Sequence, residues 1–95
     1  MVFITQEKEI QMALPRQVLY FYAPLMVFHA KYLEMMRQEE KTAIPFFAID
    51  VNSFPNQCRR FDVQSIPTII MLKNGQQFSR LEGKITVADF KNFLA

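Results

Sequence analysis

The chain has 95 residues, which are enough for one domain with a single hydrophobic core and too few for two. Hydrophobic residues make up 51% of it, including ten Phe and six Met, so its composition is not that of a disordered chain. The formal net charge of +2 is small, and the basic residues are interleaved with acidic ones, which argues against a nucleic-acid-binding surface. We therefore expect one domain that spans residues 1–95.

The sequence shows neither a membrane-spanning segment nor a secretory signal, and the expected location of the protein rests on these two observations. No apolar run approaches the roughly 18 residues of a membrane-spanning helix. The N-terminal MVFITQEKE has neither the basic start nor the long apolar segment of a secretory signal. We expect a cytoplasmic protein without membrane contact, although a domain cut from a larger or exported protein would have the same appearance.

The first half of the chain alternates apolar runs with stretches that have apolar residues at helical spacing. The run VLYFYA is almost wholly apolar, as expected of a strand covered on both faces. Thr5 can cap the helix after the first strand, and Pro15 ends that helix. The predicted elements of this half are a strand at residues 2–4, a helix at 6–14, a strand at 18–23 and a helix at 25–40.

The second half begins with another apolar run, IPFFAIDV, which predicts a buried strand. A later strand starts at Pro67, where proline removes no donor from the strand interior. Asn74-Gly75 predicts a tight hairpin turn, and the alternating strand after it is typical of an exposed sheet edge. Thr86 begins a capping box for the last helix. The predicted elements of this half are a strand at residues 44–51, a short helix at 54–61, strands at 67–73 and 76–83, and a helix after residue 86.

The predicted order of elements is βαβαβαββα. Apolar strands separated by helices predict an α/β fold with a central mixed sheet, parallel in part, and helices on both faces. The terminal hairpin adds antiparallel pairing at the edge.

Four segments in register resemble the thioredoxin family, including the domains of protein disulfide isomerase. They are VLYFYAP, FFAIDVN, SIPTIIMLKNGQ and EGKITVADFKNFL, and the resemblance covers the chain from about Val2 to Leu94. It implies a thioredoxin-like fold with a cis bond between Ile66 and Pro67, and an Ile66 backbone that pairs with an extended peptide. The alternative is that Pro67 opens its strand in trans.

The thioredoxin resemblance also shows which chemistry is missing. The family uses Trp-Cys-x-x-Cys after the second strand, in which a thiolate at a helix N-terminus attacks and a second thiol resolves the mixed disulfide. Ungapped alignment puts Leu25 at the Trp, Met26 and His29 at the two cysteines, and Val27 and Phe28 between them. Neither a thioether nor an imidazole can form that disulfide.

The register at this site is not unique. HAKYL resembles the HCKxL of disulfide isomerase domains if one residue is inserted, and Ala30 then replaces the second cysteine. Neither register supplies a thiol. The position of the family's buried acid is occupied by Tyr20, whose phenol is a poor base near neutral pH.

The chain contains one cysteine, Cys58, and one histidine, His29. A single cysteine excludes a disulfide or a two-thiol cycle within the chain, and we predict no metal site and no cofactor. We expect Cys58 to be a small residue, buried or half-buried, that packs away from the former active-site loop. The alternative is a reactive surface thiol, its pKa lowered by Arg59 and Arg60. His29 is interpreted as a contact residue, with a general base as the alternative.

The four apolar residues from Leu25 to Phe28 cannot all point inward from a helix, so we expect some of them to form an exposed patch. The alternative is that this loop refolds and buries them against Phe61 or the hairpin.

The sequence predicts a redox-inactive, non-enzymatic module that binds a protein, a peptide or a second copy of itself, and neither nucleic acid nor membrane. The predicted binding residues are Leu25, Met26, Val27, Phe28, His29, Ile66, Pro67 and Gly83. The alternative functions are a thiol–disulfide oxidoreductase, or glutathione-linked thiol transfer, through Cys58. A third class is a structural subunit of a larger assembly.

Overall fold

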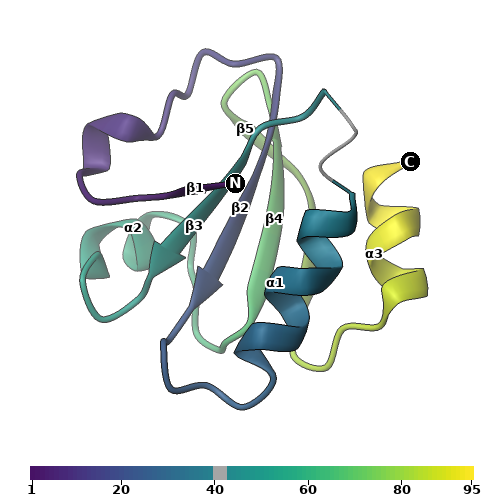
Figure 1. The fold of residues 1–95 in the computed structure, drawn as a ribbon. Helices are drawn as coiled ribbons and strands as arrows, with labels where there is room; N and C mark the ends of the chain where they lie inside the picture. The colour runs from purple at the N-terminus through teal and green to yellow at the C-terminus, as the bar shows by residue number, and fades with distance from the viewer. Residues whose placement is uncertain (40–42) are drawn as a thin grey trace.

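The structure is a computed structural model that describes residues 1–39 and 43–95. It contains a five-stranded sheet in the order β1-β3-β2-β4-β5 (Figure 1). The strands are β1 (Val2–Phe3), β2 (Arg16–Tyr22), β3 (Phe46–Asp50), β4 (Thr68–Lys73) and β5 (Gln76–Glu82). The helices are η1 (Glu7–Glu9, a 3-10 turn), α1 (His29–Gln38), α2 (Pro55–Arg60) and α3 (Val87–Leu94).

The sheet is mixed, as the sequence predicted. Strands β1, β3 and β2 are parallel, whereas β4 runs antiparallel to both β2 and β5. The hairpin turn between β4 and β5 lies at Asn74 and Gly75, which both have positive φ (51° and 79°). A side chain at Gly75 would come within 2.9 Å of the Met12 carbonyl oxygen, so this position requires glycine.

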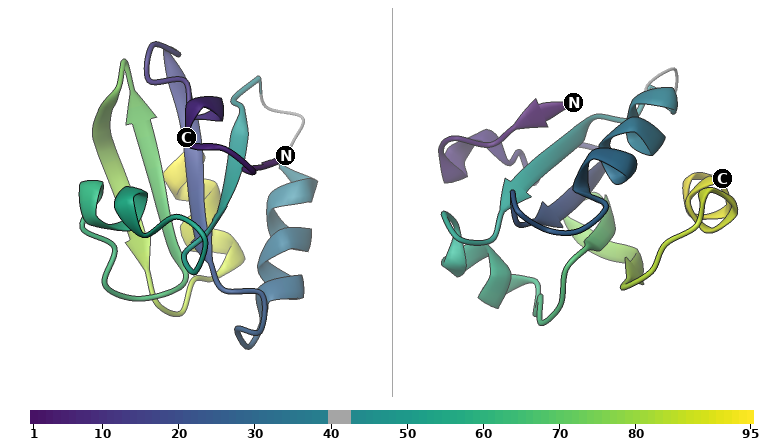
Figure 2. Two further views of the ribbon diagram at one scale, coloured as in Figure 1. Left: turned by 90° about the vertical axis from the view of Figure 1, so that its left-hand side faces the viewer. Right: turned by 60° about the horizontal axis from the view of Figure 1, so that its bottom comes forward.

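Each face of the sheet carries its own hydrophobic layer. Helices α1 and α3 cover one face, and α2 covers the other (Figure 2). Alternate residues of the central strands serve the two layers, so that Tyr20 packs toward α1 and Phe21 toward Phe61. Residues 18–21 of β2 are completely buried, as expected for a strand between two layers.

The helix predicted at residues 6–14 is wrong, because only the 3-10 turn Glu7–Glu9 forms there. The residues that pack on the sheet after this turn are Ile10, Met12 and Leu14, and Ala13 is exposed. The chain from Gln11 to Leu14 instead forms a turn, closed by a hydrogen bond of 3.2 Å from the Leu14 amide to the Gln11 carbonyl oxygen. The Glu9 carboxylate accepts hydrogen bonds from the backbone amides of Thr5 and Gln6, which closes the turn locally.

The helix predicted from residue 25 begins only at His29. Phe28, the residue before it, has a left-handed conformation (φ 68°), and Met26 donates its amide to the Ala23 carbonyl oxygen in a turn. The left-handed residue separates this turn from the helix that follows. The predicted end of the helix, residue 40, lies outside the described residues. The other predicted strands and helices agree with the structure to within two residues at their ends.

Candidate functional site

Three turns that carry the predicted binding residues meet at one end of the sheet, where β2 and β5 end and β4 begins. Phe21 near the end of β2 lies opposite Thr68 at the start of β4, and Thr68 lies opposite Glu82 at the end of β5. The Gly83 amide donates a hydrogen bond of 3.1 Å to the Pro67 carbonyl oxygen, which ties the last two turns together. Figure 1 shows the turns after β2, before β4 and after β5 at the bottom of the view.

The peptide bond between Ile66 and Pro67 is cis. Ile66 is half-buried, and its backbone amide and carbonyl make no hydrogen bond to any residue that the structure describes. Backbone groups with unused hydrogen-bonding capacity at the end of a sheet are suited to pairing with an extended peptide.

Beside this backbone lies the loop that follows β2. The side chains of Leu25, Val27 and Phe28 are 97%, 71% and 60% exposed. Met26 instead packs partly against the hydrophobic layer beneath α1. Three of the four predicted apolar residues are thus exposed next to each other, rather than buried against Phe61. We call Leu25, Val27 and Phe28 the loop patch.

His29 and Tyr20 form a hydrogen-bonded pair beneath the loop patch. The Tyr20 hydroxyl lies 2.8 Å from His29 Nδ1, and the His29 ring stacks on Tyr22 at 4.5 Å between ring centroids. Burial raises the pKa of the Tyr20 phenol, so Tyr20 keeps its proton, and the imidazole tautomer decides which of the two groups donates. Burial also lowers the pKa of His29, an effect that the Asp50 carboxylate partly opposes.

The consequence of this pair is a histidine committed to a structural contact. Its Nδ1 is engaged by the Tyr20 hydroxyl in either tautomer. Among residues 1–39 and 43–95, no group of three or more His, Cys, Asp or Glu side chains could hold a metal ion. In the same residues, no helix is long and apolar enough to cross a membrane.

Cys58 lies on α2 and packs against the hydrophobic layer opposite to that of Met26. It is half-buried, and burial raises the pKa of its thiol more than the nearby Arg59 lowers it. It lines a hollow of about 240 Å³ together with Ile66. The only thiol of the chain is therefore close to the unpaired backbone but is poorly ionised.

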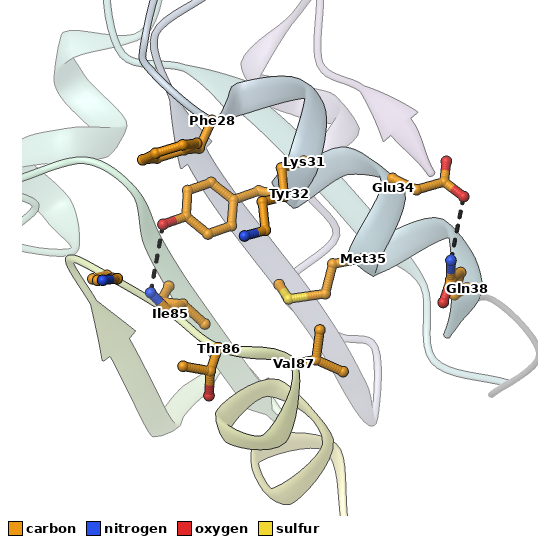
Figure 3. A pocket seen from close by; sticks show the side chains of 10 residues that line it. Phe28, Lys31, Tyr32, Glu34, Met35, Gln38, Ile85, Thr86 and Val87 are labelled. Carbon is orange, nitrogen blue, oxygen red and sulfur yellow. Dashed lines mark hydrogen bonds between the residues drawn. The ribbon is translucent and has the colours of Figure 1, made fainter.

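One feature of this region was not found from the sequence. A groove of about 570 Å³ lies between α1 and the segment from Lys84 to Val87, and Phe28 lies at its rim (Figure 3). Its two walls are about fifty residues apart in the chain, so no local pattern indicates it. Val87, an apolar residue just after the Thr86 cap, is 51% exposed at this groove.

The sheet order and the cis-proline beside the start of α1 define a thioredoxin fold. Oxidised thioredoxin from Plasmodium falciparum superimposes with a TM-score of 0.89 at 18% identity, covering 98% of this chain and 93% of that one. Thioredoxin O2 from Arabidopsis thaliana gives 0.85 at 18% identity, covering 98% and 90%. The Thioredoxin family model matches residues 4–95, so the chain belongs to the thioredoxin family.

Among curated proteins, thioredoxin from Mycobacterium tuberculosis is 39% identical over 54 residues. The match covers 57% of this chain and 47% of that protein, so the chain spans about half the length of this relative. The family of the chain is therefore established by the match to the family model and not by this relative.

Proposed function

We propose that this chain is a redox-inactive member of the thioredoxin family that binds an extended polypeptide at the edge formed by the loop patch and Ile66. The observation that supports the proposal most is the exposed loop patch beside backbone groups of Ile66 that have no partner among the described residues. The peptide would pair its backbone with Ile66, while its side chains contact Val27 and Phe28.

The absence of a dithiol from the sequence supports a binding role over an enzymatic one. Disulfide exchange within one domain requires an attacking and a resolving thiol, and the chain has only Cys58. At the start of α1, where a thiolate would gain from the helix dipole, the chain has instead the His29 imidazole, hydrogen-bonded to Tyr20. The proposed partner is a protein, in the cytoplasm, and neither a nucleic acid nor a membrane.

Two exposed phenylalanines provide a matched test. Phe28 is 60% exposed in the loop patch, and Phe78 is 61% exposed on the edge strand β5. Three proteins are immobilised and compared for the proteins that they retain from native extract. They are the wild type, the double variant Val27→Asp with Phe28→Asp, and the single variant Phe78→Asp. We expect the double variant to retain its partner at least about tenfold less, because aromatic anchors at the centre of an interface dominate its affinity.

The control, Phe78→Asp, should retain the partner as the wild type does. Equal retention by all three proteins would contradict the proposal. Sedimentation of the purified chain separates a foreign partner from a second copy: loss of a dimer in the double variant alone would identify a second copy as the partner.

The alternative, glutathione-linked thiol transfer, is favoured by the hollow that Cys58 shares with Ile66. The raised pKa of Cys58 opposes it, because the thiolate is the reactive form. Glutathione-exchange and insulin-reduction assays on the wild type and on Cys58→Ser distinguish the two functions. Turnover that depends on Cys58 would replace the binding role with an enzymatic one, and we expect none.

A further inference from the structure

The groove between α1 and the segment before α3 is apolar inside. Its inner walls are formed by Tyr32, Met35 and Ile85, which are buried side chains of the hydrophobic layer. The Tyr32 hydroxyl accepts a hydrogen bond of 3.5 Å from the Ile85 amide, which joins the two walls (Figure 3). Phe28 and Val87 extend the apolar surface toward solvent.

The groove also has a positively charged rim. Lys31 and Lys84 line it, both are exposed, and neither pairs with a carboxylate in the part of the chain that the structure describes. Figure 3 shows Lys31 reaching over the groove beside the Tyr32 ring, with its ammonium 5.7 Å from the Phe28 ring centroid. The rim therefore has two cationic groups without a counterion among residues 1–39 and 43–95.

The nearby carboxylates are directed to other partners. Glu34 also lines the groove, and its carboxylate accepts a hydrogen bond of 3.4 Å from Gln38 (Figure 3). Among the lining residues the two ammonium groups of Lys31 and Lys84 therefore outnumber the single carboxylate of Glu34. Asp89 accepts a hydrogen bond from the Thr86 amide at the start of α3, at 3.1 Å. The groove is thus complementary to a ligand that combines apolar atoms with negative charge.

The groove is continuous with the edge at Ile66. Gly83 is hydrogen-bonded to Pro67 and directly precedes Lys84. No atom lies within 4 Å of the position where a side chain at Gly83 would point, so the surface between the two places is open. A chain paired with Ile66 could cross Gly83 and enter the groove without an obstacle.

We infer that the groove selects the partner: it takes a polypeptide segment in which an apolar side chain stands beside Asp or Glu residues. This inference rests on the proposed function, because the segment is the continuation of the peptide paired at Ile66. The apolar side chain lies on Tyr32, Met35 and Ile85, and the carboxylates face Lys31 and Lys84. A polypeptide is favoured because the groove continues from a backbone-pairing edge.

The experiment uses two synthetic eight-residue peptides with blocked termini, identical except at two positions. Both contain a Leu-Phe pair, which is followed by two Glu residues in one peptide and by two Lys residues in the other. Each is titrated at low ionic strength into the isotope-labelled 95-residue chain, and backbone amide shifts are followed by NMR. The test variant is the double substitution Lys31→Glu with Lys84→Glu. The control variant, Lys8→Glu with Lys73→Glu, has the same change of charge outside the groove.

We expect the wild type to bind the acidic peptide about fivefold more tightly than the basic one, given the modest strength of exposed ion pairs. The shifts should include the amides of Ile66 and Ile85. Lys31→Glu with Lys84→Glu should reverse the preference, whereas the control variant should keep it. Raising the salt concentration should weaken the preference of the wild type.

The outcomes separate this inference from the proposed function. Equal affinity for the two peptides, with shifts at Ile66, would contradict the charge selection alone. If neither peptide affects Ile66 or the groove, both proposals are wrong. Decanoate that shifts Ile85 while neither peptide does would identify a fatty-acid site and overturn the inference. Ile85 shifts that change on dilution of the chain alone would identify a second copy as the occupant and overturn it as well.

Discussion

Two neighbouring stretches of this chain are equally apolar in sequence and have opposite environments. Residues 18–21 of β2 are fully buried, whereas Leu25, Val27 and Phe28 just after the strand are 60–97% exposed. Strand β2 lies between β3 and β4 with a hydrophobic layer on each face, but the loop patch extends beyond the end of the sheet. Burial therefore follows position in the fold, and the loop patch leaves its apolar side chains exposed.

The strongest test of this comparison is a pair of truncations. Phe21→Ala removes a completely buried ring that packs against Phe61, and should lower the free energy of unfolding by about 3–5 kcal/mol. Val27→Ala removes two methyl groups that are already largely in water, and should change the free energy by less than about 0.5 kcal/mol. Urea denaturation measures both values. Similar losses for the two variants would mean that the loop patch is buried in solution.

The contact beneath the loop patch should have an intermediate effect. Tyr20→Phe removes the hydroxyl that is hydrogen-bonded to His29 Nδ1, and should cost about 0.5–1.5 kcal/mol of stability. The double variant Tyr20→Phe with His29→Phe removes both polar partners. Its loss of unfolding free energy should therefore be smaller than the sum of the losses in the two single variants. Urea denaturation of the two single variants and the double variant gives the coupling energy. Additive losses would show that the pair does not couple the loop to the sheet.

The same pair predicts a dependence of stability on pH. Burial holds the pKa of His29 below its ordinary value of 6.5, so the unfolded chain binds this proton more readily than the folded one. Stability should be highest above that value and fall as the pH drops through it, because the buried site disfavours the charged imidazole. The difference in unfolding free energy between wild type and His29→Gln, followed from pH 8 to pH 5, isolates this effect. A difference independent of pH would contradict it.

Much of the fold could be predicted because its signals are local. The apolar run of β2, the turn at Asn74-Gly75 and the capping box at Thr86 each depend on residues close in sequence. The helix predicted at residues 6–14 was wrong for the opposite reason. Ile10 and Met12 pack against the hydrophobic layer of the sheet without forming a helix, and the sheet is not visible in a window of nine residues.

The exposure of the loop after β2 was predicted, but the geometry around it was not. The sequence indicated that apolar side chains after β2 would be exposed, yet it contained no turn residue to mark Phe28 as left-handed. The bond from Tyr20 to His29 had a weaker signal, since a buried phenol needs a partner and His29 is the only histidine. The groove with Lys31 and Lys84 depends on the approach of two distant segments, which only the folded chain provides.

The smallest expected effect separates stability from binding within the loop patch. Phe28 has a φ of 68°, a conformation that costs a residue with a side chain about 1–2 kcal/mol. Glycine adopts it freely but loses about 0.5–1 kcal/mol through the greater freedom of the unfolded chain. Phe28→Gly should therefore raise the free energy of unfolding by a few tenths to about 1 kcal/mol while weakening partner binding.

Val27→Gly provides the matched control for this last prediction. Val27 is a neighbouring exposed residue without a positive φ, so glycine there relieves no strain and should lower stability slightly. Thermal unfolding and partner retention are measured on both variants. A gain in stability with loss of the partner in Phe28→Gly alone would mean that the chain keeps a strained aromatic residue in the loop patch for contact. Unchanged binding in Phe28→Gly would instead remove Phe28 from the contact surface and restrict it to Leu25, Val27 and Ile66.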